Sequence, residues 1–334
     1  MTEHEKLLRR TFKGKTCLVT GGAGFIGSHL VERLAELGAN VIIYDNLMRG
    51  KHSIRNLNEI YQRFPTPRLV VGDILDFERL KPLVNESDFI FHLAALPSHR
   101  LALERPRDYA LIDLIGTVNI LEAMRLSKKR KQKMVFASSN KVYGKQKTPW
   151  REDMPYAPEG PYAQAKVSAE EFCKQYHKYY GIKTIIIRYH HVIGTRTNPE
   201  LALAIFTERV LQGKPPIIHG HFEKGKFTPC AADFTNIADA VNGTLIATAK
   251  VKDLDIFNIA KPKLTTVLEL AELVIKYLNS KVKPRFIEML PHETLLHHSD
   301  VSKAKKVLGF EAKIPAEVSV KQYVEWRLSY GKNF

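Results

Sequence analysis

The 334-residue sequence has few cysteines, only Cys17, Cys173 and Cys230, and no Cys-x-x-Cys pair. An odd number of widely spaced cysteines indicates neither a disulfide framework nor a thiolate zinc site, and it fits a reducing compartment. No uninterrupted apolar stretch approaches the roughly 18 residues that a membrane-spanning helix needs. The opening segment, Met1–Lys15, lacks the apolar region of a signal peptide and is predicted to be a short charged arm. These absences favour a cytoplasmic protein with no membrane partner.

Acidic residues are scarce relative to basic ones: 35 Asp and Glu against 51 Lys and Arg give a formal net charge of +16. A field of this sign favours anionic ligands, among them nucleotides, acidic surfaces and nucleic acid. A large net charge is also a common way to keep a protein soluble. The basic run 128–133 lies where a helix is expected to end, and cations there complement the helix dipole. We therefore interpret that run as a solvated helix end and do not expect a nucleic-acid partner.

The first half of the chain alternates β-branched runs with amphipathic stretches, which is typical of a parallel sheet wrapped by helices. Strands are expected at Thr16–Thr20, Asn40–Tyr44, Arg68–Val71, Phe89–His92, Lys133–Ala137 and Lys183–Arg188. Helices are expected at Phe25–Leu37, Ser53–Arg63, Phe77–Val84, Arg107–Leu126 and Pro161–Tyr180. Most of these strands are continuous apolar runs, so both faces of the sheet should be covered. The predicted fold class is α/β with a doubly wound parallel sheet.

After Arg188 the alternation weakens, and prolines mark a loop-rich stretch with one expected helix, Leu201–Gln212. Later helices are expected at Asn236–Thr248, Val267–Asn279, Val301–Val307 and Ala316–Ser329. This pattern predicts a smaller, discontinuous α/β domain on the C-terminal side. The first domain should comprise residues 1–188 plus 233–260, and the second residues 189–232 plus 261–334.

A glycine-rich turn, Thr-Gly-Gly-Ala-Gly-Phe-Ile-Gly-Ser at residues 20–28, joins the first strand to the first predicted long helix. Glycines at positions 21, 24 and 27 allow a tight turn, close approach of a pyrophosphate, and close packing of helix on strand. The amides of the helix start, including Phe25 and Ile26, are then available to phosphate oxygens. The residues expected to bind a dinucleotide here are Gly21, Gly24, Phe25, Ile26 and Gly27.

Asp45 and Asn46 follow the second strand, where a carboxylate accepts hydrogen bonds from a ribose 2′-OH and repels a 2′-phosphate. This favours NAD over NADP. Asp73 and Ile74 follow the third strand, where the sheet would meet an adenine ring, but Asp73 could equally cap a helix.

Ser139 ends the fifth strand, and Tyr162 and Lys166 lie one turn apart at the start of the following helix. Residues four apart share one helical face, so the Lys166 ammonium should lie near the Tyr162 ring or the cofactor. A neighbouring cation and a positively charged nicotinamide both favour phenolate, and so would lower the pKa of Tyr162 towards neutrality. Tyr162 would then shuttle a proton, Ser139 would hold the substrate oxygen, and Lys166 would also bind the nicotinamide ribose.

With these motifs in order, the chain resembles the extended short-chain dehydrogenase/reductase superfamily, and within it the nucleotide-sugar epimerases and dehydratases. Further matching segments are His92–Ala95, Gly116–Thr117, Val142–Gly144, Arg188–Tyr189, Phe257–Ile259 and Leu308–Phe310. The resemblance implies a Rossmann domain that binds NAD, with Leu93, Ala94 and Ala95 among the contacts, and a substrate-binding cap domain. It also implies that a hydride is taken from a sugar carbon and returned.

The leading hypothesis is a UDP-hexose 4-epimerase that works through a transient 4-keto intermediate. The resemblance implies an acidic pair before Val142 in dehydratases, and Asn140 and Lys141 occupy those positions here. Dehydration is therefore disfavoured. Segment 139–144 is also similar to CDP-sugar 2-epimerases, and Ser138–Asn140 to uronate dehydrogenases. A net dehydrogenase and a non-catalytic RNA-binding member of the fold remain as alternatives.

The predicted substrate site departs from the family pattern. His191 replaces the usual phosphate-contacting Asn, Ala232 replaces an Arg, and no Arg occurs between Pro291 and Asp300. Losing guanidinium groups matters because they bind diphosphate in bidentate fashion. The residues expected to bind substrate are Ser138, Ser139, Asn140, His191, Arg196 and Lys224.

Two expectations concern metals and assembly. The histidines lack carboxylates or thiolates at the spacing of metal motifs, so no metal is expected. Family members commonly dimerise through the helix that bears the catalytic Tyr and the long helix before the fifth strand. A homodimer is expected here, with apolar positions Leu111, Leu114, Val118 and Leu121 on the second of these helices.

Overall fold

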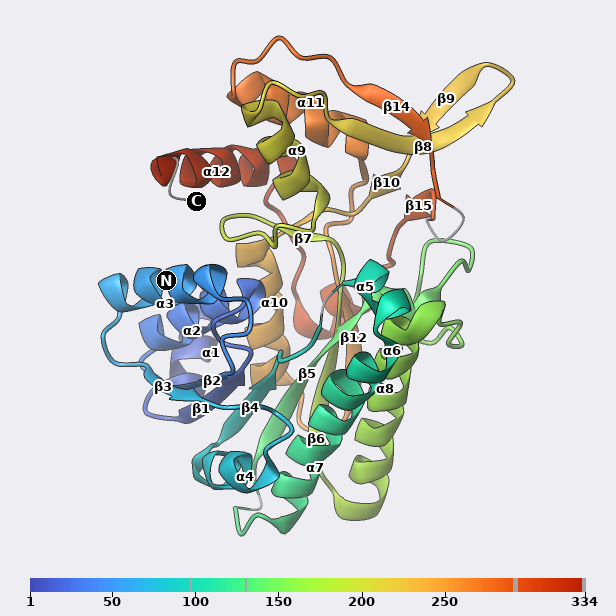
Figure 1. Cartoon of the computed structure of the whole chain (residues 1–334). Helices are drawn as coiled ribbons and strands as arrows, with labels where there is room; N and C mark the ends of the chain where they lie inside the picture. The colour runs from blue at the N-terminus through green and yellow to red at the C-terminus, as the bar shows by residue number, and fades with distance from the viewer. Residues whose placement is uncertain (97, 130, 291–293, 332–334) are drawn as a thin grey trace. The chain divides into compact units, whose positions relative to one another are not determined.

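The computed structural model describes residues 1–96, 98–129, 131–290 and 294–331 (Figure 1). The chain forms two compact units, one made of residues 1–144, 155–188 and 241–257, the other of residues 145–154, 189–240 and 258–334. Compared with the expected division, segments 145–154, 233–240 and 258–260 group with the second unit. Within the described ranges, no helix is both long and apolar enough to cross a bilayer.

The first unit is built on a seven-stranded sheet in the order β12-β6-β5-β4-β1-β2-β3. Its strands are β1 (Thr16–Thr20), β2 (Asn40–Asp45), β3 (Arg68–Val71), β4 (Phe89–His92), β5 (Lys133–Ser139), β6 (Lys183–Tyr189) and β12 (Asp255–Ile259). Pairs β1–β2, β1–β4, β2–β3 and β4–β5 are parallel. The order in which successive strands are added to the sheet reverses between β1 and β4, which is the switch point of a doubly wound sheet. The predicted α/β fold class is therefore confirmed.

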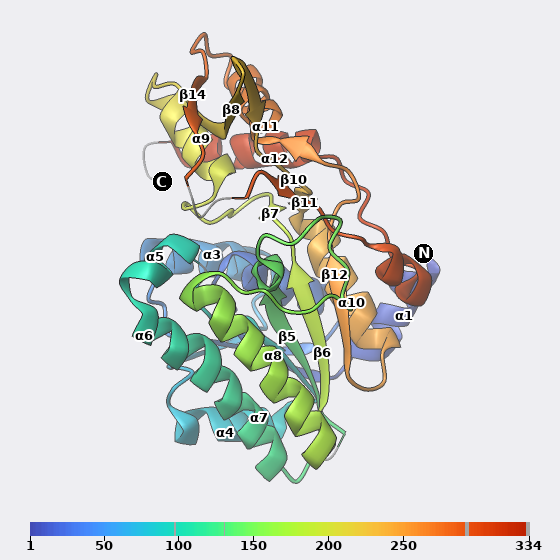
Figure 2. The same ribbon diagram turned by 90° about the vertical axis from the view of Figure 1, so that its right-hand side faces the viewer.

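Helices cover both faces of this sheet (Figures 1 and 2). They are α1 (Glu3–Phe12), α2 (Phe25–Glu36), α3 (Lys51–Arg63), α4 (Phe77–Glu86), α5 (His99–Glu104), α6 (Pro106–Tyr109), α7 (Gly116–Leu126), α8 (Gly160–Tyr180) and α10 (Ile237–Lys250). A π-helical turn, Ala110–Ile115, joins α6 to α7, and a short 3-10 turn, Asn140–Tyr143, follows β5. In Figure 2 strands β5 and β6 separate α7 and α8 from α1 and α10.

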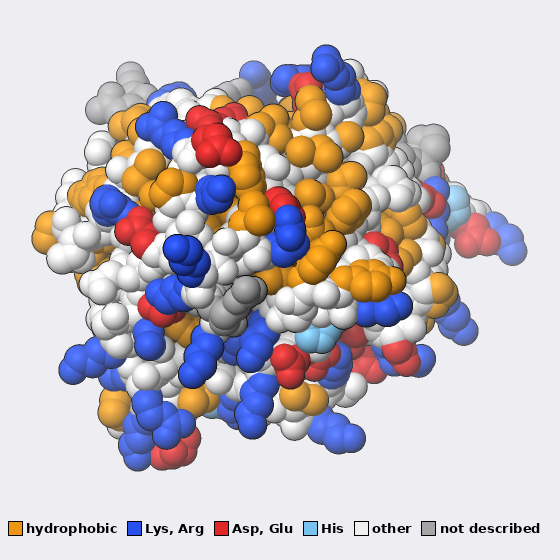
Figure 3. Space-filling model, turned by 90° about the horizontal axis from the view of Figure 1, so that it is seen from below, with side chains coloured by type: hydrophobic (Ala, Val, Ile, Leu, Met, Phe, Trp, Pro, Cys, Tyr) orange, Lys and Arg blue, Asp and Glu red, His pale blue; other side chains and the backbone are white. Residues whose placement is uncertain are grey.

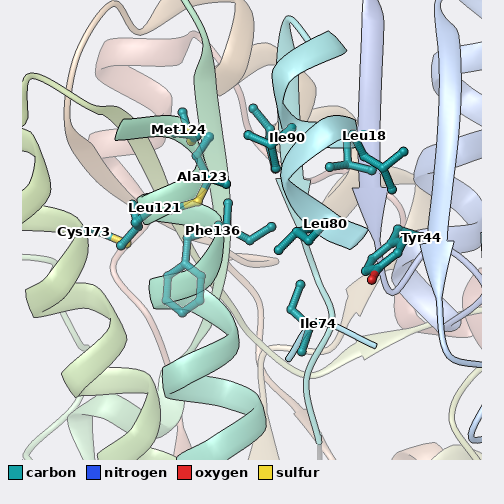
Figure 4. Close-up of a cluster of buried hydrophobic side chains, with 14 of the residues drawn as sticks. Leu18, Tyr44, Ile74, Leu80, Ile90, Leu121, Ala123, Met124, Phe136 and Cys173 are labelled. Carbon is teal, nitrogen blue, oxygen red and sulfur yellow. The ribbon is translucent and has the colours of Figure 1, made fainter. Parts of the chain in front are cut away.

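The core between the sheet and helices α4, α7 and α8 is apolar (Figure 4). Leu18 and Ile90 of the sheet are fully buried there, as are Leu121 of α7 and Cys173 of α8. Phe136 of β5 lies in the same cluster. Burial of this kind supplies most of the folding free energy, and it fixes the strand ends from which the site residues project.

The amino-terminal segment was expected to be an arm, and that prediction is wrong. It forms helix α1, which is capped by Thr2 and buries Leu8 and Phe12. The Phe12 ring packs 5.1 Å from the ring of Phe89 and 6.2 Å from that of Phe91, both on β4. Charged residues on the exposed face of α1 mask these two apolar positions in the sequence.

In its described residues, the second unit contains short strands and three longer helices. The strands are β7 (Val192–Ile193), β8 (Ile217–Glu223), β9 (Lys226–Pro229), β10 (Ala231–Ala232), β11 (Thr235–Asn236), β13 (Thr265–Thr266), β14 (Arg285–Glu288) and β15 (Leu296–His297). The helices are α9 (Ala202–Leu211), α11 (Val267–Tyr277) and α12 (Ala316–Ser329), with a π-helical turn at Ala304–Leu308. The helices pack around a second apolar core that includes Leu203, Leu270 and Tyr323.

The stretch expected to be loop-rich contains a β-hairpin. Strands β8 and β9 pair with Phe222 opposite Phe227, and β14 pairs with β8 on its other side. The turn residues Lys224 and Gly225 both have positive φ, 48° and 78°. Much of these strands is exposed, so the sequence gives no clear alternation of apolar and polar residues there.

Candidate active site

The glycine turn between β1 and α2 is crowded by backbone. A Cβ on Gly21 would lie 2.7 Å from the Ala94 nitrogen, and one on Gly27 would lie 2.1 Å from the Gly21 oxygen. Gly21 also has a φ of 69°. Helix α2 begins at Phe25, and its N-cap residue, Gly24, has no side chain that could cap it. The amides of the first turn, including those of Phe25 and Ile26, are therefore not covered by a capping side chain. This arrangement fits a phosphate at the helix start.

The end of β4 lies against this turn. The Leu93 amide donates to the Thr20 carbonyl at 3.1 Å, and the Ala94 amide to the Thr20 hydroxyl at 3.3 Å. Ala95 follows and is partly buried. The segments after β1 and β4 therefore meet at the switch point of the sheet, where open α/β sheets bind ligands.

Asp45 lies at the end of β2 and holds the neighbouring turns. Its Oδ2 accepts the Ala23 amide at 3.0 Å, and its Oδ1 accepts the Leu47 amide at 2.8 Å. Burial raises the pKa of Asp45, and these two hydrogen bonds act in the opposite direction. Each carboxylate oxygen has a second lone pair, which leaves capacity to accept a ribose hydroxyl.

Asp73 lies close to Asn46, as their expected role in one site requires. The Asn46 amide donates to Asp73 Oδ2 at 3.0 Å. Asp76, and not Asp73, caps helix α4, by accepting the Arg79 amide at 3.1 Å. The buried Ile74 contributes its carbonyl, which accepts the Asn119 side-chain amide at 3.0 Å.

Ser139, Tyr162 and Lys166 come together at the end of β5 and the start of α8. The Lys166 ammonium is buried, 5.2 Å from the ring centroid of Phe136 and 5.8 Å from that of Tyr162. Its ion-pair partner is Asp113 Oδ2, at 3.6 Å. Burial and the Asp113 charge raise the pKa of Tyr162 above its usual value, while hydrogen bonding to Ser139 lowers it. The protein alone therefore does not produce the lowered pKa of Tyr162 that the sequence suggested.

Behind these residues lies a buried charged network centred on Glu170 of α8. Ser138 donates to Glu170, and Arg188 donates to both of its carboxylate oxygens, at 3.0 and 2.7 Å. Arg188 also donates to the Tyr143 hydroxyl at 2.8 Å. The Ser138 hydroxyl is thus engaged inside the protein, whereas Ser139 lies beside Asn140, with 3.4 Å between the Ser139 hydroxyl and Asn140 Oδ1. The sequence offered no motif that pointed to Glu170.

The remaining expected substrate residues belong to the second unit. His191 has a φ of 31° and places Nδ1 3.9 Å from the buried Asp233. Arg196 is buried, with a φ of 61°. Lys224 is exposed at the tip of the β8–β9 hairpin. His191 and Arg196 therefore sit in well-packed surroundings, and Lys224 does not.

A model of the NAD dependent epimerase/dehydratase family matches residues 17–260, which carry the glycine turn, Ser139, Tyr162 and Lys166. The chain belongs to this family. Membership in the NAD dependent epimerase/dehydratase family confirms the resemblance seen in the sequence.

The similarity to known proteins extends over more than 90% of this chain. The chain is 32% identical to UDP-glucuronate 4-epimerase 4 of Arabidopsis thaliana, over 96% of this chain and 77% of the relative. It is 32% identical to the Thermotoga maritima UDP-glucose 4-epimerase solved with UDP-glucose, with a TM-score of 0.82 over 94% and 99% of the two chains. It is 27% identical to the Bacillus cereus UDP-glucuronic acid 4-epimerase solved with UDP-glucuronic acid and NAD, with a TM-score of 0.86 over 94% and 99%.

Proposed function

We propose that this protein is an NAD-dependent epimerase that inverts C4 of the sugar in a UDP-linked hexose or hexuronate. The observation that carries the proposal is the convergence of Ser139, Tyr162 and Lys166 at the edge of the sheet that also holds the glycine turn. Relatives named as 4-epimerases of UDP-glucose and UDP-glucuronate, and solved structures of such enzymes with NAD, support both the reaction and the cofactor.

The residues present fit NAD. A Cβ on Gly21 or Gly27 would fill the turn where the pyrophosphate approaches, and Asp45 stands where the adenosine ribose hydroxyls need an acceptor. Lys166 would hold the nicotinamide ribose. When bound, NAD supplies a hydride acceptor that later returns the hydride to the sugar.

The protein's own residues handle the proton and the orientation. Tyr162 takes the proton of the sugar 4-hydroxyl as C4 is oxidised, and returns it to the same oxygen when C4 is reduced on its opposite face. Ser139 donates a hydrogen bond to that oxygen and fixes its distance from Tyr162. Asn140 and Lys141 offer no carboxyl group to remove water, so the 4-keto sugar is rotated and reduced rather than dehydrated.

The test is incubation with a panel of UDP-, GDP-, CDP- and dTDP-sugars, with products separated by chromatography and identified by NMR. The expected result is a C4 epimer of a UDP-sugar without net formation of NADH. Steady accumulation of NADH would instead indicate a dehydrogenase, and failure with every sugar would refute the proposal.

Tyr162→Phe tests the proton shuttle in the same assay. The variant should bind NAD as the unmodified protein does but lose about 100-fold or more of its turnover, because it lacks the general acid and base. Tyr179→Phe is the matched control, since Tyr179 is on the same helix and 65% exposed. Full activity of Tyr162→Phe would exclude the assigned role.

We also infer a homodimer in the cytoplasm. Ile115 and Leu126, on the π-turn and α7, and Phe172 and Tyr180 of α8 are all exposed by more than 40%. Leu121, expected at the interface, lies instead in the core. Phe172→Glu should convert a dimer into a monomer in light scattering coupled to gel filtration. A monomeric unmodified protein would contradict the inference.

A further inference from the structure

Asp113 is a buried carboxylate beside the catalytic Lys166 that no motif in the sequence identified. It lies in the π-helical turn Ala110–Ile115, and its side chain has no exposed surface. The Leu96 amide donates to its Oδ1 at 2.8 Å. Such a wide turn rotates a side chain out of the regular helical register, and π-turns of this kind are often found at functional sites.

The other carboxylate oxygen faces Lys166. Among the residues that the structure describes, none donates a hydrogen bond to Asp113 Oδ2, and the Lys166 ammonium is 3.6 Å away. An asparagine could accept the Leu96 amide equally well through its own side-chain oxygen. The negative charge therefore has a function that the amide contact does not explain, and its only close cation in the described part of the chain is Lys166.

We propose that Asp113 is a positioning residue that holds the Lys166 ammonium and offsets its charge, so that Tyr162 stays protonated until a cationic nicotinamide is bound. This inference rests on the proposed function, in which Tyr162 is the proton shuttle. Asp113 acts through Lys166 and through its field at the phenol, without contact with the sugar.

The charges around Tyr162 support this assignment. His92 of β4 bonds to the hydroxyls of Thr20 and Thr117, and burial together with the Lys166 charge lowers the pKa of His92 to about 3. His92 is thus neutral at physiological pH. Glu170, one turn beyond Lys166 on α8, is already paired with Arg188.

Among the side chains that the structure describes, further groups near Tyr162 and Lys166 carry no formal charge at neutral pH. They are the phenol of Tyr109, the hydroxyl of Ser139 and the ring of Phe136 under Lys166. Lys166 and Asp113 therefore form an almost neutral pair in the protein by itself. Burial holds the pKa of Asp113 above its usual value, and Lys166 and the Leu96 amide act against that rise by favouring the carboxylate. The positive nicotinamide would be the first charge without a partner to reach the phenol.

Asp113→Asn tests the proposal in the protein without added cofactor. Tyrosine ionisation is followed by NMR of the ring Cζ carbons in ¹³C-tyrosine-labelled protein, and the Tyr162 signal is assigned by its loss in Tyr162→Phe. In the unmodified protein Tyr162 should remain protonated where ordinary tyrosines ionise, near about pH 10. In Asp113→Asn its midpoint should fall by about 1 pH unit or more, because Lys166 then acts unopposed.

Asp108→Asn is the matched control. It removes the same charge from helix α6, just before the π-turn, but Asp108 pairs with Arg105 and not with the site. Its Tyr162 midpoint should not move. If Asp113→Asn does not fold, Asp113→Ser keeps an acceptor for the Leu96 amide in a smaller volume. An unchanged or raised Tyr162 midpoint in the folded variant, or an equal shift in Asp108→Asn, would overturn the proposal.

A second measurement separates a positioning role from a purely structural one. If the sugar panel identifies a substrate, the acid limb of the kcat–pH profile of Asp113→Asn should move to lower pH, while KM at the plateau stays unchanged. Loss of activity at all pH values, with an unmoved Tyr162 midpoint, would indicate a structural role only. The NMR titration does not depend on turnover, so it decides on Asp113 even if the proposed reaction fails.

Discussion

At the scale of single residues, the glycine turn at the predicted cofactor site can form only because its glycines have no Cβ atom. Gly27→Ala would place a Cβ 2.1 Å from the Gly21 oxygen, a distance that backbone must move to relieve. We expect the variant to lose about 1–3 kcal/mol of stability from overpacking. NAD affinity should also fall by about tenfold or more, because the turn that contacts the pyrophosphate is displaced and each 1.4 kcal/mol of lost binding free energy is a tenfold change in Kd. Chemical denaturation and titration calorimetry measure the two effects.

Gly50→Ala is the control for this prediction. Gly50 has a φ of 55°, but no atom lies within 4 Å of the position of its Cβ, so the change costs backbone strain without a clash. It should lower stability and leave NAD affinity unchanged. Equal loss of NAD affinity in both variants would contradict the steric account of Gly27.

The residues of the site divide into those that local sequence predicts and those that it does not. Gly21, Ser139, Tyr162 and Lys166 are predictable because their chemistry requires a particular residue type at a particular place on a strand or helix end. Asp113 is different, because its significance comes from an ion pair with a residue far along the chain. Only the folded structure brings such charges together.

At the scale of elements, helix α1 shows how a charged surface can hide a core position. Phe12 is fully buried against Phe89 and Phe91. Phe12→Ala should therefore cost about 3–5 kcal/mol of unfolding free energy, the usual range for removing a buried ring. Arg10→Ala, on the exposed face of the same helix, should change it by less than about 0.5 kcal/mol. If chemical denaturation gave Phe12→Ala and Arg10→Ala the same free energy of unfolding, the packing of α1 would not contribute to stability.

In the second unit, Asp233 joins three segments of chain. It lies 3.4 Å from His190 Nδ1, just beyond β6, and accepts the Ser299 amide, after β15, at 2.9 Å. Burial would raise the pKa of Asp233. The charges of His190 and His191, and the hydrogen bonds that they donate, outweigh burial and hold the pKa well below its usual range. Asp233 thus stabilises the fold when ionised.

The sign of that shift gives a pH dependence. A carboxyl group whose pKa is lower in the folded than in the unfolded protein stabilises the fold when it is ionised. This stabilisation is fully present above the pKa of the unfolded state, about 3.9, and is lost as the pH falls below that value towards the pKa of the folded state. Asp233→Asn should cost about 3–5 kcal/mol at pH 7, because it breaks a buried pair. The difference from the unmodified protein should narrow below about pH 4.

Calorimetry of thermal unfolding across pH measures this difference. Glu317→Gln, which removes an exposed ion pair with Lys276, should cost under about 1 kcal/mol and serves as the control. A cost of Asp233→Asn that is independent of pH would exclude the electrostatic explanation.

At the scale of the whole molecule, the sequence predicts the first unit better than the second. Buried parallel strands such as β1 and β5 can be recognised in the sequence as apolar runs, because both of their faces are covered. The two-residue strands β10 and β15 have no such pattern, and they pair only because tertiary contacts bring distant segments together. The His191 and Arg196 surroundings were for the same reason unpredictable.

The net charge of the whole molecule predicts that the reaction depends on ionic strength. Lys and Arg side chains are spread over the face seen in Figure 3, in keeping with the net charge of +16. A positive field attracts anions such as UDP-sugars, and salt screens it. We expect kcat/KM to fall by about 3- to 10-fold as ionic strength rises from about 0.05 to 0.5 M, with kcat nearly constant.

Two surface lysines test whether this attraction is global. Lys128 and Lys131, which follow the end of α7, line a surface concavity with Lys15 and Asp88. Changing both to Glu lowers the net charge by four without altering any group assigned to the site. If the summed field draws the substrate in, the double variant should show a lower kcat/KM at low salt and a shallower salt dependence. An unchanged salt slope would place the attraction in the site itself, and sucrose at matched osmolality controls for effects unrelated to charge.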